Sequence, residues 1–101
     1  MLGTRASREQ YELIRALCPD AVYDSLSRLV KIIRKPVELR GSVAVCTAGT
    51  ADIPVAEEAA QTAEFFGSKV NRVYDVGVSG LHRLLASLDP IQEANCVIAV
   101  A

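Results

Sequence analysis

Two short segments contain most of the residues that could carry out chemistry, and residues 47–52 (TAGTAD) form the first of them. Small residues such as Gly49 let the backbone approach a ligand closely, and the hydroxyls of Thr47 and Thr50 can hydrogen-bond to it. Asp52 could accept from a ribose hydroxyl, and the N-terminus of the helix expected next would attract an anion. The pattern predicts a nucleotide-binding loop, although Thr50 and Asp52 would equally suit a plain cap of that helix.

Residues 74–83 (YDVGVSGLHR) form the second segment, which holds the only histidine of the chain. Asp75 is expected at the end of a strand, Gly80 permits a close backbone approach, and His82 falls in the first turn of the following helix. Because a helix N-terminus disfavours the imidazolium, a neutral His82 could transfer a proton near neutral pH, with Asp75 fixing its tautomer. The alternative is a surface histidine without a role, followed by a solvated Arg83 instead of a phosphate clamp.

The elements that must position both segments are expected in residues 41–101, where strands and helices alternate. The periodicity predicts strands over 42–48, 69–76 and 95–101 and helices over 55–66 and 78–88. This order indicates an α/β fold, a three-layer doubly wound parallel sheet of the flavodoxin-like or Rossmann-like kind, truncated to its first strands. Ligands bind outside the carboxyl ends of the strands in such sheets, so the two segments should converge there.

The faces of these elements can also be predicted. One apolar face of the first helix in this region is expected to be buried, and it consists of Val55, Ala59, Ala63 and Phe66. The acidic residues of the same helix are interpreted as a solvated face, not as a general acid pair: Glu57, Glu58 and Glu64. The first and last strands are continuous apolar runs, typical of strands buried on both faces.

Residues 1–40 are expected to form an N-terminal helix and a connecting strand. Residues 7–18 (SREQYELIRALC) begin with a capping box at Ser7 and end directly before a proline, as a helix would. Residues 29–33 alternate like a strand, while a short helical turn over 23–26 is equally compatible with the pattern.

Composition excludes several classes of function. The chain has 11 basic and 12 acidic residues, so no basic face for nucleic acid is expected. No apolar run approaches the roughly 20 residues of a membrane helix. The N-terminus lacks the apolar core of a secretory signal, which favours the cytoplasm. The cysteines lack metal-ligand spacing and are interpreted as structural thiols, the last two of them within buried apolar runs: Cys18, Cys46 and Cys96.

Together the two segments resemble the C-terminal, PurE-like domain of the LarB family, which makes the precursor of the nickel-pincer cofactor. The likeness runs from Thr4 to Ala101 and rests mainly on TAGTADIPVAEEA and YDVGVSGLHRLL. PurE is an aminoimidazole ribonucleotide carboxylase, and the chain departs from its pattern because no tryptophan follows Asp52 and no Thr-Pro follows Arg83. Both departures favour the LarB family.

This resemblance implies an enzyme that carboxylates the pyridinium ring of nicotinic acid adenine dinucleotide with CO2 and hydrolyses its phosphoanhydride. The products would be pyridinium-3,5-biscarboxylic acid mononucleotide and AMP. The family's nucleophilic cysteine belongs to a motif beyond residue 101, so the chain is expected to hold the first half of the domain and part of the site. No tightly bound cofactor is expected, CO2 or bicarbonate would be the co-substrate, Mg2+ is plausible, and relatives form homo-octamers.

Within that site, the resemblance implies His82 and Asp75 as the catalytic groups. The substrate would be held by Thr47, Gly49, Thr50, Asp52, Gly80 and Arg83. Two alternatives stay open. One is a PurE-like aminoimidazole ribonucleotide carboxylase or mutase of purine biosynthesis, in which the histidine transfers the proton. The other is a non-catalytic nucleotide-binding or structural fragment.

Overall fold

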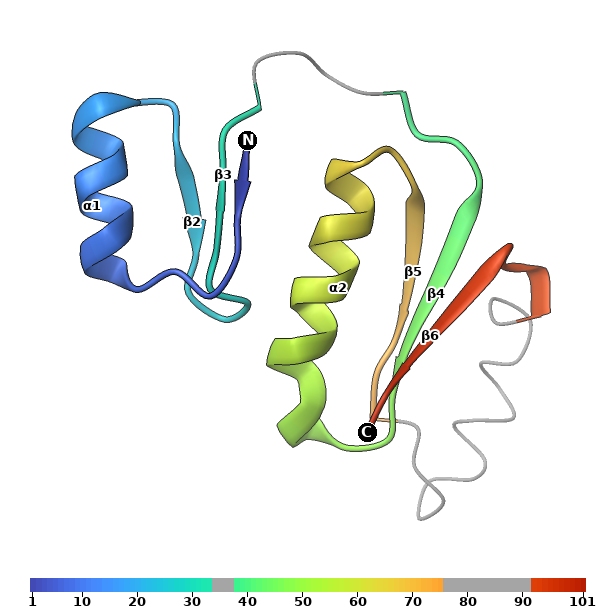
Figure 1. The fold of residues 1–101 in the computed structure, drawn as a ribbon. Coiled ribbons are helices and arrows are strands. Elements are labelled where there is room, and N and C mark those ends of the chain that lie inside the picture. The colour runs from blue at the N-terminus through green and yellow to red at the C-terminus, as the bar shows by residue number, and fades with distance from the viewer. Residues whose placement is uncertain (34–37, 76–91) are drawn as a thin grey trace.

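The computed structural model describes residues 1–33, 38–75 and 92–101. The described chain forms two small three-stranded sheets (Figure 1). The first sheet and its helix comprise β1 (Leu2–Gly3), α1 (Arg8–Leu17), β2 (Val22–Asp24) and β3 (Leu29–Lys31). The second comprises β4 (Ser42–Thr47), the short 3-10 helix η1 (Thr50–Asp52), α2 (Ile53–Phe65), β5 (Lys69–Val73) and β6 (Cys96–Val100).

Local signals define α1 as the sequence predicts. The Ser7 hydroxyl accepts from the N–H of Gln10 while the Gln10 side chain accepts from the N–H of Ser7, so the capping box is confirmed. The helix ends at Cys18, whose N–H donates to the carbonyl of Ile14. The ring of Tyr11 stacks on Tyr23 with centroids 5.2 Å apart, and this contact fastens α1 to the adjacent sheet.

The N-terminal sheet is antiparallel with the order β1-β3-β2, which the sequence did not predict. The strand expected over 29–33 is confirmed for Leu29–Lys31, but the helical turn over 23–26 is wrong, because Tyr23 lies in β2 opposite Val30. Segments of two or three residues carry too short a pattern to identify a strand. Pairing with β3, which is fully buried at Leu29, determines their conformation.

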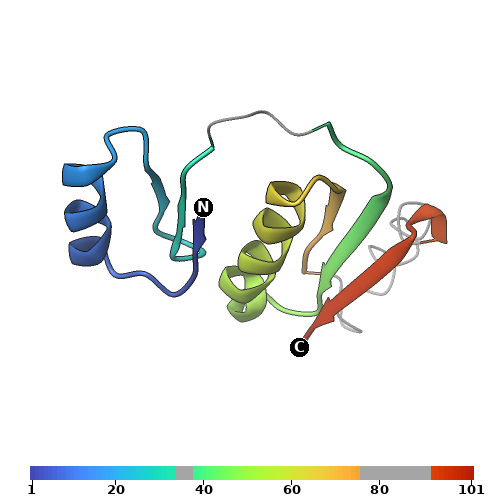
Figure 2. The ribbon, with the colours of Figure 1, turned by 45° about the horizontal axis from the view of Figure 1, so that its top comes forward.

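The second sheet is parallel, with β4 in the centre of the order β5-β4-β6. Val43 of β4 is paired with Val70 on one side and with Cys96 on the other. Helix α2 lies between the two sheets in both views (Figures 1 and 2). It packs on the parallel sheet through fully buried Ala56 and Ala60, which contact fully buried Val45. The chain is therefore a mixed α/β protein with a parallel sheet.

Two burial predictions are wrong. Val55 and Phe66, expected in the core, are 50% and 73% exposed, because α2 turns its alanine line towards the sheet instead. The last strand is confirmed as β6, but it is not buried on both faces, since Val97 is 47% exposed. The end of α2 agrees with expectation, because Gly67 follows it with a φ of +96°, a conformation that favours glycine.

The helix predicted over 78–88 lies outside the described residues. Among the residues that are described, no helix is long and apolar enough to cross a membrane.

Candidate functional site

The carboxyl ends of β4 and β5 lie at one edge of the parallel sheet, where Cys46 is paired with Val73. Just beyond this pair, the backbone N–H of Asp75 donates a 3.0 Å hydrogen bond to Oγ1 of Thr47. This bond joins the beginnings of the two segments that the sequence singles out. Thr47 is only 1% exposed, and its hydroxyl holds the beginning of the second segment. Its role in substrate binding stays a prediction.

The strand order marks this edge as a place for a ligand. From the central β4 the chain passes to β5 on one side and later to β6 on the other. Parallel sheets bind ligands outside the strand ends at such a reversal of order. Thr47 is paired with Val100 of β6, so the loop that follows Thr47 begins at this reversal.

Residues 48–52 present an open backbone at this edge. Gly49 is extended with a φ of −129°, and Thr50 is exposed at the start of η1. A methyl group built on Gly49 would have Oδ2 of Asp52 as its nearest neighbour at 3.9 Å, so the carboxylate lies beside this glycine. Asp52 occupies the N-cap position of α2, yet its side chain makes no capping hydrogen bond. The alternative in which the Asp52 side chain simply caps α2 is therefore wrong.

Asp75 is the last described residue before the second segment continues. Its φ of +59° places it in the left-handed region, which Asp tolerates better than most residues but which costs about 1 kcal/mol or more in general. The hydrogen bond to Thr47 offsets part of that cost, because one intramolecular hydrogen bond contributes about 0.5–1.5 kcal/mol. Gly80, His82 and Arg83 lie outside the described residues.

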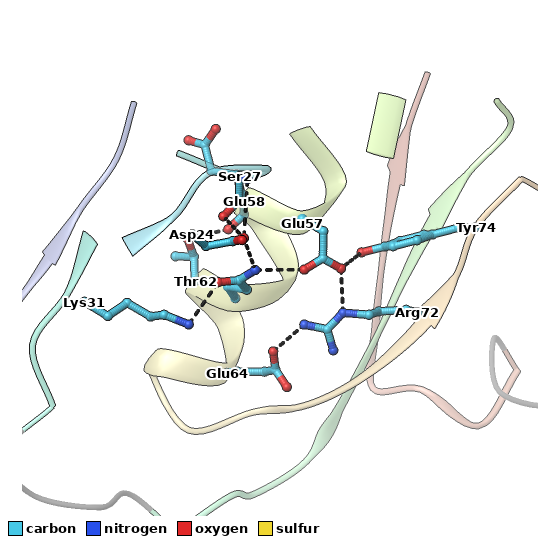
Figure 3. Close-up of polar contacts among 10 residues, drawn as sticks. Asp24, Ser27, Lys31, Glu57, Glu58, Thr62, Glu64, Arg72 and Tyr74 are labelled. Carbon is cyan, nitrogen blue, oxygen red and sulfur yellow. Dashed lines mark hydrogen bonds and ion pairs between the residues drawn. The ribbon is translucent and has the colours of Figure 1, made fainter. Parts of the chain in front are cut away.

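A polar network beside the edge was missed by the sequence analysis, which assigned Glu57 to a solvated face. The Glu57 carboxylate is 12% exposed, and its Oε1 accepts 2.7 Å hydrogen bonds from the Tyr74 hydroxyl and from Nε of Arg72 (Figure 3). Its Oε2 accepts from the amide of Gln61 at 2.9 Å. Arg72 also forms an ion pair with Glu64. Two spacings signal this arrangement. Glu57 and Gln61 are four apart on a helix, and Tyr74, directly after β5, is two residues from Arg72 within it, a spacing that puts both side chains on the same side of an extended chain.

The network shifts the protonation of its members. Burial raises the pKa of Glu57, but hydrogen bonds from Arg72, Gln61 and Tyr74 outweigh it and hold the pKa below its usual range. Burial and the neighbouring Glu57 carboxylate raise the pKa of Tyr74 well above its ordinary value. At neutral pH the carboxylate is therefore charged and the phenol is a donor.

The cysteines stand apart from these contacts. Cys46 is half-buried, and burial raises the pKa of its thiol, which disfavours a nucleophilic thiolate there. Cys18 packs against the N-terminal core. Cys96 is exposed, so the expectation of a buried thiol is wrong at this position. Within the described residues, no three His, Cys, Asp or Glu side chains are grouped as ligands of a metal ion.

Fold and site together define a mixed α/β protein with a candidate ligand-binding edge on its parallel sheet. The chain is 44% identical over 75 residues to the uncharacterized protein MJ0165 of Methanocaldococcus jannaschii. The match covers 72% of this chain but 29% of the relative, so the chain spans less than a third of that protein's length. No protein-family model matches the chain.

Proposed function

We propose that the chain is part of a LarB-type enzyme that carboxylates nicotinic acid adenine dinucleotide and hydrolyses its phosphoanhydride, releasing AMP. The observation that carries the proposal is the hydrogen bond between Thr47 and Asp75, since it brings two segments distant in the sequence to one edge of a parallel sheet. The strand order with β4 at the centre agrees with the first strands of a doubly wound, PurE-like sheet. A cytoplasmic homo-oligomer belongs to the same proposal.

The roles of the first segment follow from its geometry. The extended backbone at Gly49 and the exposed hydroxyl of Thr50 would contact phosphate or ribose, and the Asp52 carboxylate would accept from a ribose hydroxyl. The partial positive charge at the start of α2 would favour the pyrophosphate, although the N–H of Ile53 already donates to Thr50 and Pro54 has none. All these groups are polar and none is a strong nucleophile, which suits binding better than covalent chemistry.

The chemistry itself needs a nucleophile and a proton acceptor. A cationic pyridinium ring attacks CO2 only after a thiolate has added to it and made it enamine-like. Restoring the aromatic ring then expels the thiolate and releases the ring proton, for which His82 is the proposed acceptor. The resemblance places the thiolate in a motif beyond residue 101. Mg2+ stays a plausible co-reactant of phosphoanhydride cleavage and would be held largely by the substrate's own phosphates, because the described residues group no three His, Cys, Asp or Glu side chains.

Calorimetry tests this proposal. Titration of nicotinic acid adenine dinucleotide into the chain should show saturable binding, which Thr50→Ala and Asp52→Asn weaken. Thr4→Ala is the matched control, because Thr4 is also exposed and lies in the N-terminal part of the chain. With bicarbonate added, residues 1–101 alone should release no AMP. Absence of binding at millimolar concentrations of the dinucleotide would refute the proposal.

The same preparation distinguishes the PurE-like alternative. If the protein turns over aminoimidazole ribonucleotide and His82→Asn abolishes this activity, the substrate is the imidazole nucleotide and not the dinucleotide. Binding of neither nucleotide would leave a structural role.

A further inference from the structure

A continuous set of hydrogen bonds leads from the N-terminal sheet to helix α2. The Lys31 ammonium of β3 donates to Oε1 of Gln61 at 2.9 Å. The amide nitrogen of Gln61 donates to Oδ2 of Asp24 in β2 at 2.6 Å and to Oε2 of Glu57 at 2.9 Å. Both amide hydrogens and the carbonyl oxygen of Gln61 are therefore used, and the residue links the two parts of the chain.

Asp24 is itself held in place on the N-terminal side. Its Oδ2 accepts from the hydroxyl of Ser27 at 2.6 Å, and Ser27 is 3% exposed. Hydrogen bonds from Ser27 lower the pKa of Asp24, so the carboxylate is charged when it meets Gln61. The hydrogen bond from Gln61 of α2 is therefore accepted by a carboxylate, that of Asp24, which Ser27 already holds in place.

The other end of this set reaches the candidate site. Glu57 accepts from the hydroxyl of Tyr74, whose ring packs on the core of the parallel sheet. Tyr74 directly precedes Asp75, and the N–H of Asp75 is bonded to Thr47. The chain is therefore held at two adjacent residues: the phenol of Tyr74 is bonded to α2, and the backbone N–H of Asp75 is bonded to β4. The left-handed φ of Asp75 comes directly after these two fixed points.

We propose that Glu57 is a positioning residue, which fixes Asp75 at the carboxyl edge of the sheet through Tyr74. We further infer that Gln61 makes this position depend on the docking of the N-terminal sheet against α2. The N-terminal part of the chain is then more than a spacer, because its docking against α2 affects the position of Asp75. Any consequence for substrate affinity rests on the proposed function, whereas the positioning of Asp75 does not.

Amide hydrogen exchange measured by NMR tests the positioning directly and needs no ligand. Glu57→Gln should speed exchange of the Asp75 amide by about tenfold while the amide of Val45, in the central strand, stays unchanged. Glu58→Gln is the matched control, since it removes the same charge one residue along α2. In the described structure only the backbone carbonyl of Glu58, and not its carboxylate, accepts a hydrogen bond, from Thr62.

Tyr74→Phe keeps the experiment decisive if Glu57→Gln folds poorly, because it removes a single hydroxyl and should also speed exchange at Asp75. Gln61→Leu should speed that exchange less than Glu57→Gln, since the bond between Glu57 and Tyr74 remains. An unchanged Asp75 amide in Glu57→Gln and Tyr74→Phe, or a uniform change at all amides, would overturn the positioning role. An unchanged amide in Gln61→Leu would overturn the dependence on the N-terminal sheet.

Affinity for nicotinic acid adenine dinucleotide supplies the second readout. Glu57→Gln should weaken binding by roughly tenfold and Glu58→Gln by less than about twofold. If the wild-type chain does not bind the dinucleotide, the proposed function fails, and the exchange data still decide the positioning role. If Glu57→Gln loosens Asp75 but binding is unaffected, Asp75 is positioned by Glu57 without serving this substrate, and the functional part of the inference is overturned.

Discussion

Replacing Thr47 by valine isolates the one bond that joins the two segments. Valine has nearly the shape of threonine, so the buried site, which is 1% exposed, neither gains a cavity nor loses packing. What disappears is the acceptor for the N–H of Asp75, now 3.0 Å from Oγ1. An unsatisfied buried donor costs about 1–3 kcal/mol, which is a large part of the stability of a small domain.

Urea unfolding measures this loss, with Thr47→Ser as the control. Serine keeps the hydroxyl and removes one buried methyl group, worth about 0.8 kcal/mol. For a domain of this size, a loss of 1–3 kcal/mol by Thr47→Val should lower the urea midpoint by about 0.5–2 M, more than Thr47→Ser does. The Asp75 amide should also exchange faster in the valine variant and stay protected in the serine variant.

The order of the two variants decides the matter. If Thr47→Val is as stable as the wild type, or more stable than Thr47→Ser, the hydroxyl is not the group that holds the second segment. The convergence of the two segments would then rest on strand pairing alone.

Three further outcomes are expected. Gly49→Ala should change the free energy of unfolding by less than about 0.5 kcal/mol, because φ is −129° and the nearest atom to the new methyl is 3.9 Å away. The same variant should nevertheless weaken dinucleotide binding measured by calorimetry. Gly67→Ala, at a φ of +96°, should destabilise by about 1 kcal/mol or more. In thermal unfolding, Phe66→Ser should cost less than about 0.5 kcal/mol and Val45→Ala about 2 kcal/mol, since the first side chain is 73% exposed and the second fully buried; equal losses would contradict the observed orientation of α2. The folded-state pKa of Glu57 lies below its usual 4.5, so its contribution to stability is present above pH 4.5 and is lost as the pH falls through the lowered value. The stability difference between wild type and Glu57→Gln should therefore shrink on acidification. A difference that stays constant down to pH 3 would count against a charged Glu57 in the folded state.

Local signals were enough for several elements of the fold. The capping box at Ser7, the apolar run of β4 and the glycine after α2 each depend on residues close in the sequence, and each was predicted correctly. Burial was predicted less well on α2, because this helix has two apolar lines. The alanines at 56 and 60 face the sheet, since their small side chains let the helix backbone approach closely, while Val55 and Phe66 are left exposed.

The candidate site divides in the same way. Alternation of strands and helices predicted that residues 47–52 and the segment beginning at Asp75 share one edge, because parallel strands all point the same way. The sequence did not reveal that Thr47 is a buried acceptor or that Glu57 is the centre of a network. A threonine at a strand end and a glutamate on an alanine-rich helix look solvated until their neighbours are known.

The sequence by itself determined helices α1 and α2, the apolar strands β4 and β6 and the small polar residues of the first loop, because these follow from short-range periodicity and capping. Only the tertiary structure decided which helix face is covered, that a short antiparallel sheet packs beside α2, and which polar atoms meet. The reason is physical: a hydrogen bond between groups 17 or 28 residues apart, such as Glu57 with Tyr74 or Thr47 with Asp75, exists only after the chain has folded. Its partners are selected by packing and not by spacing along the chain.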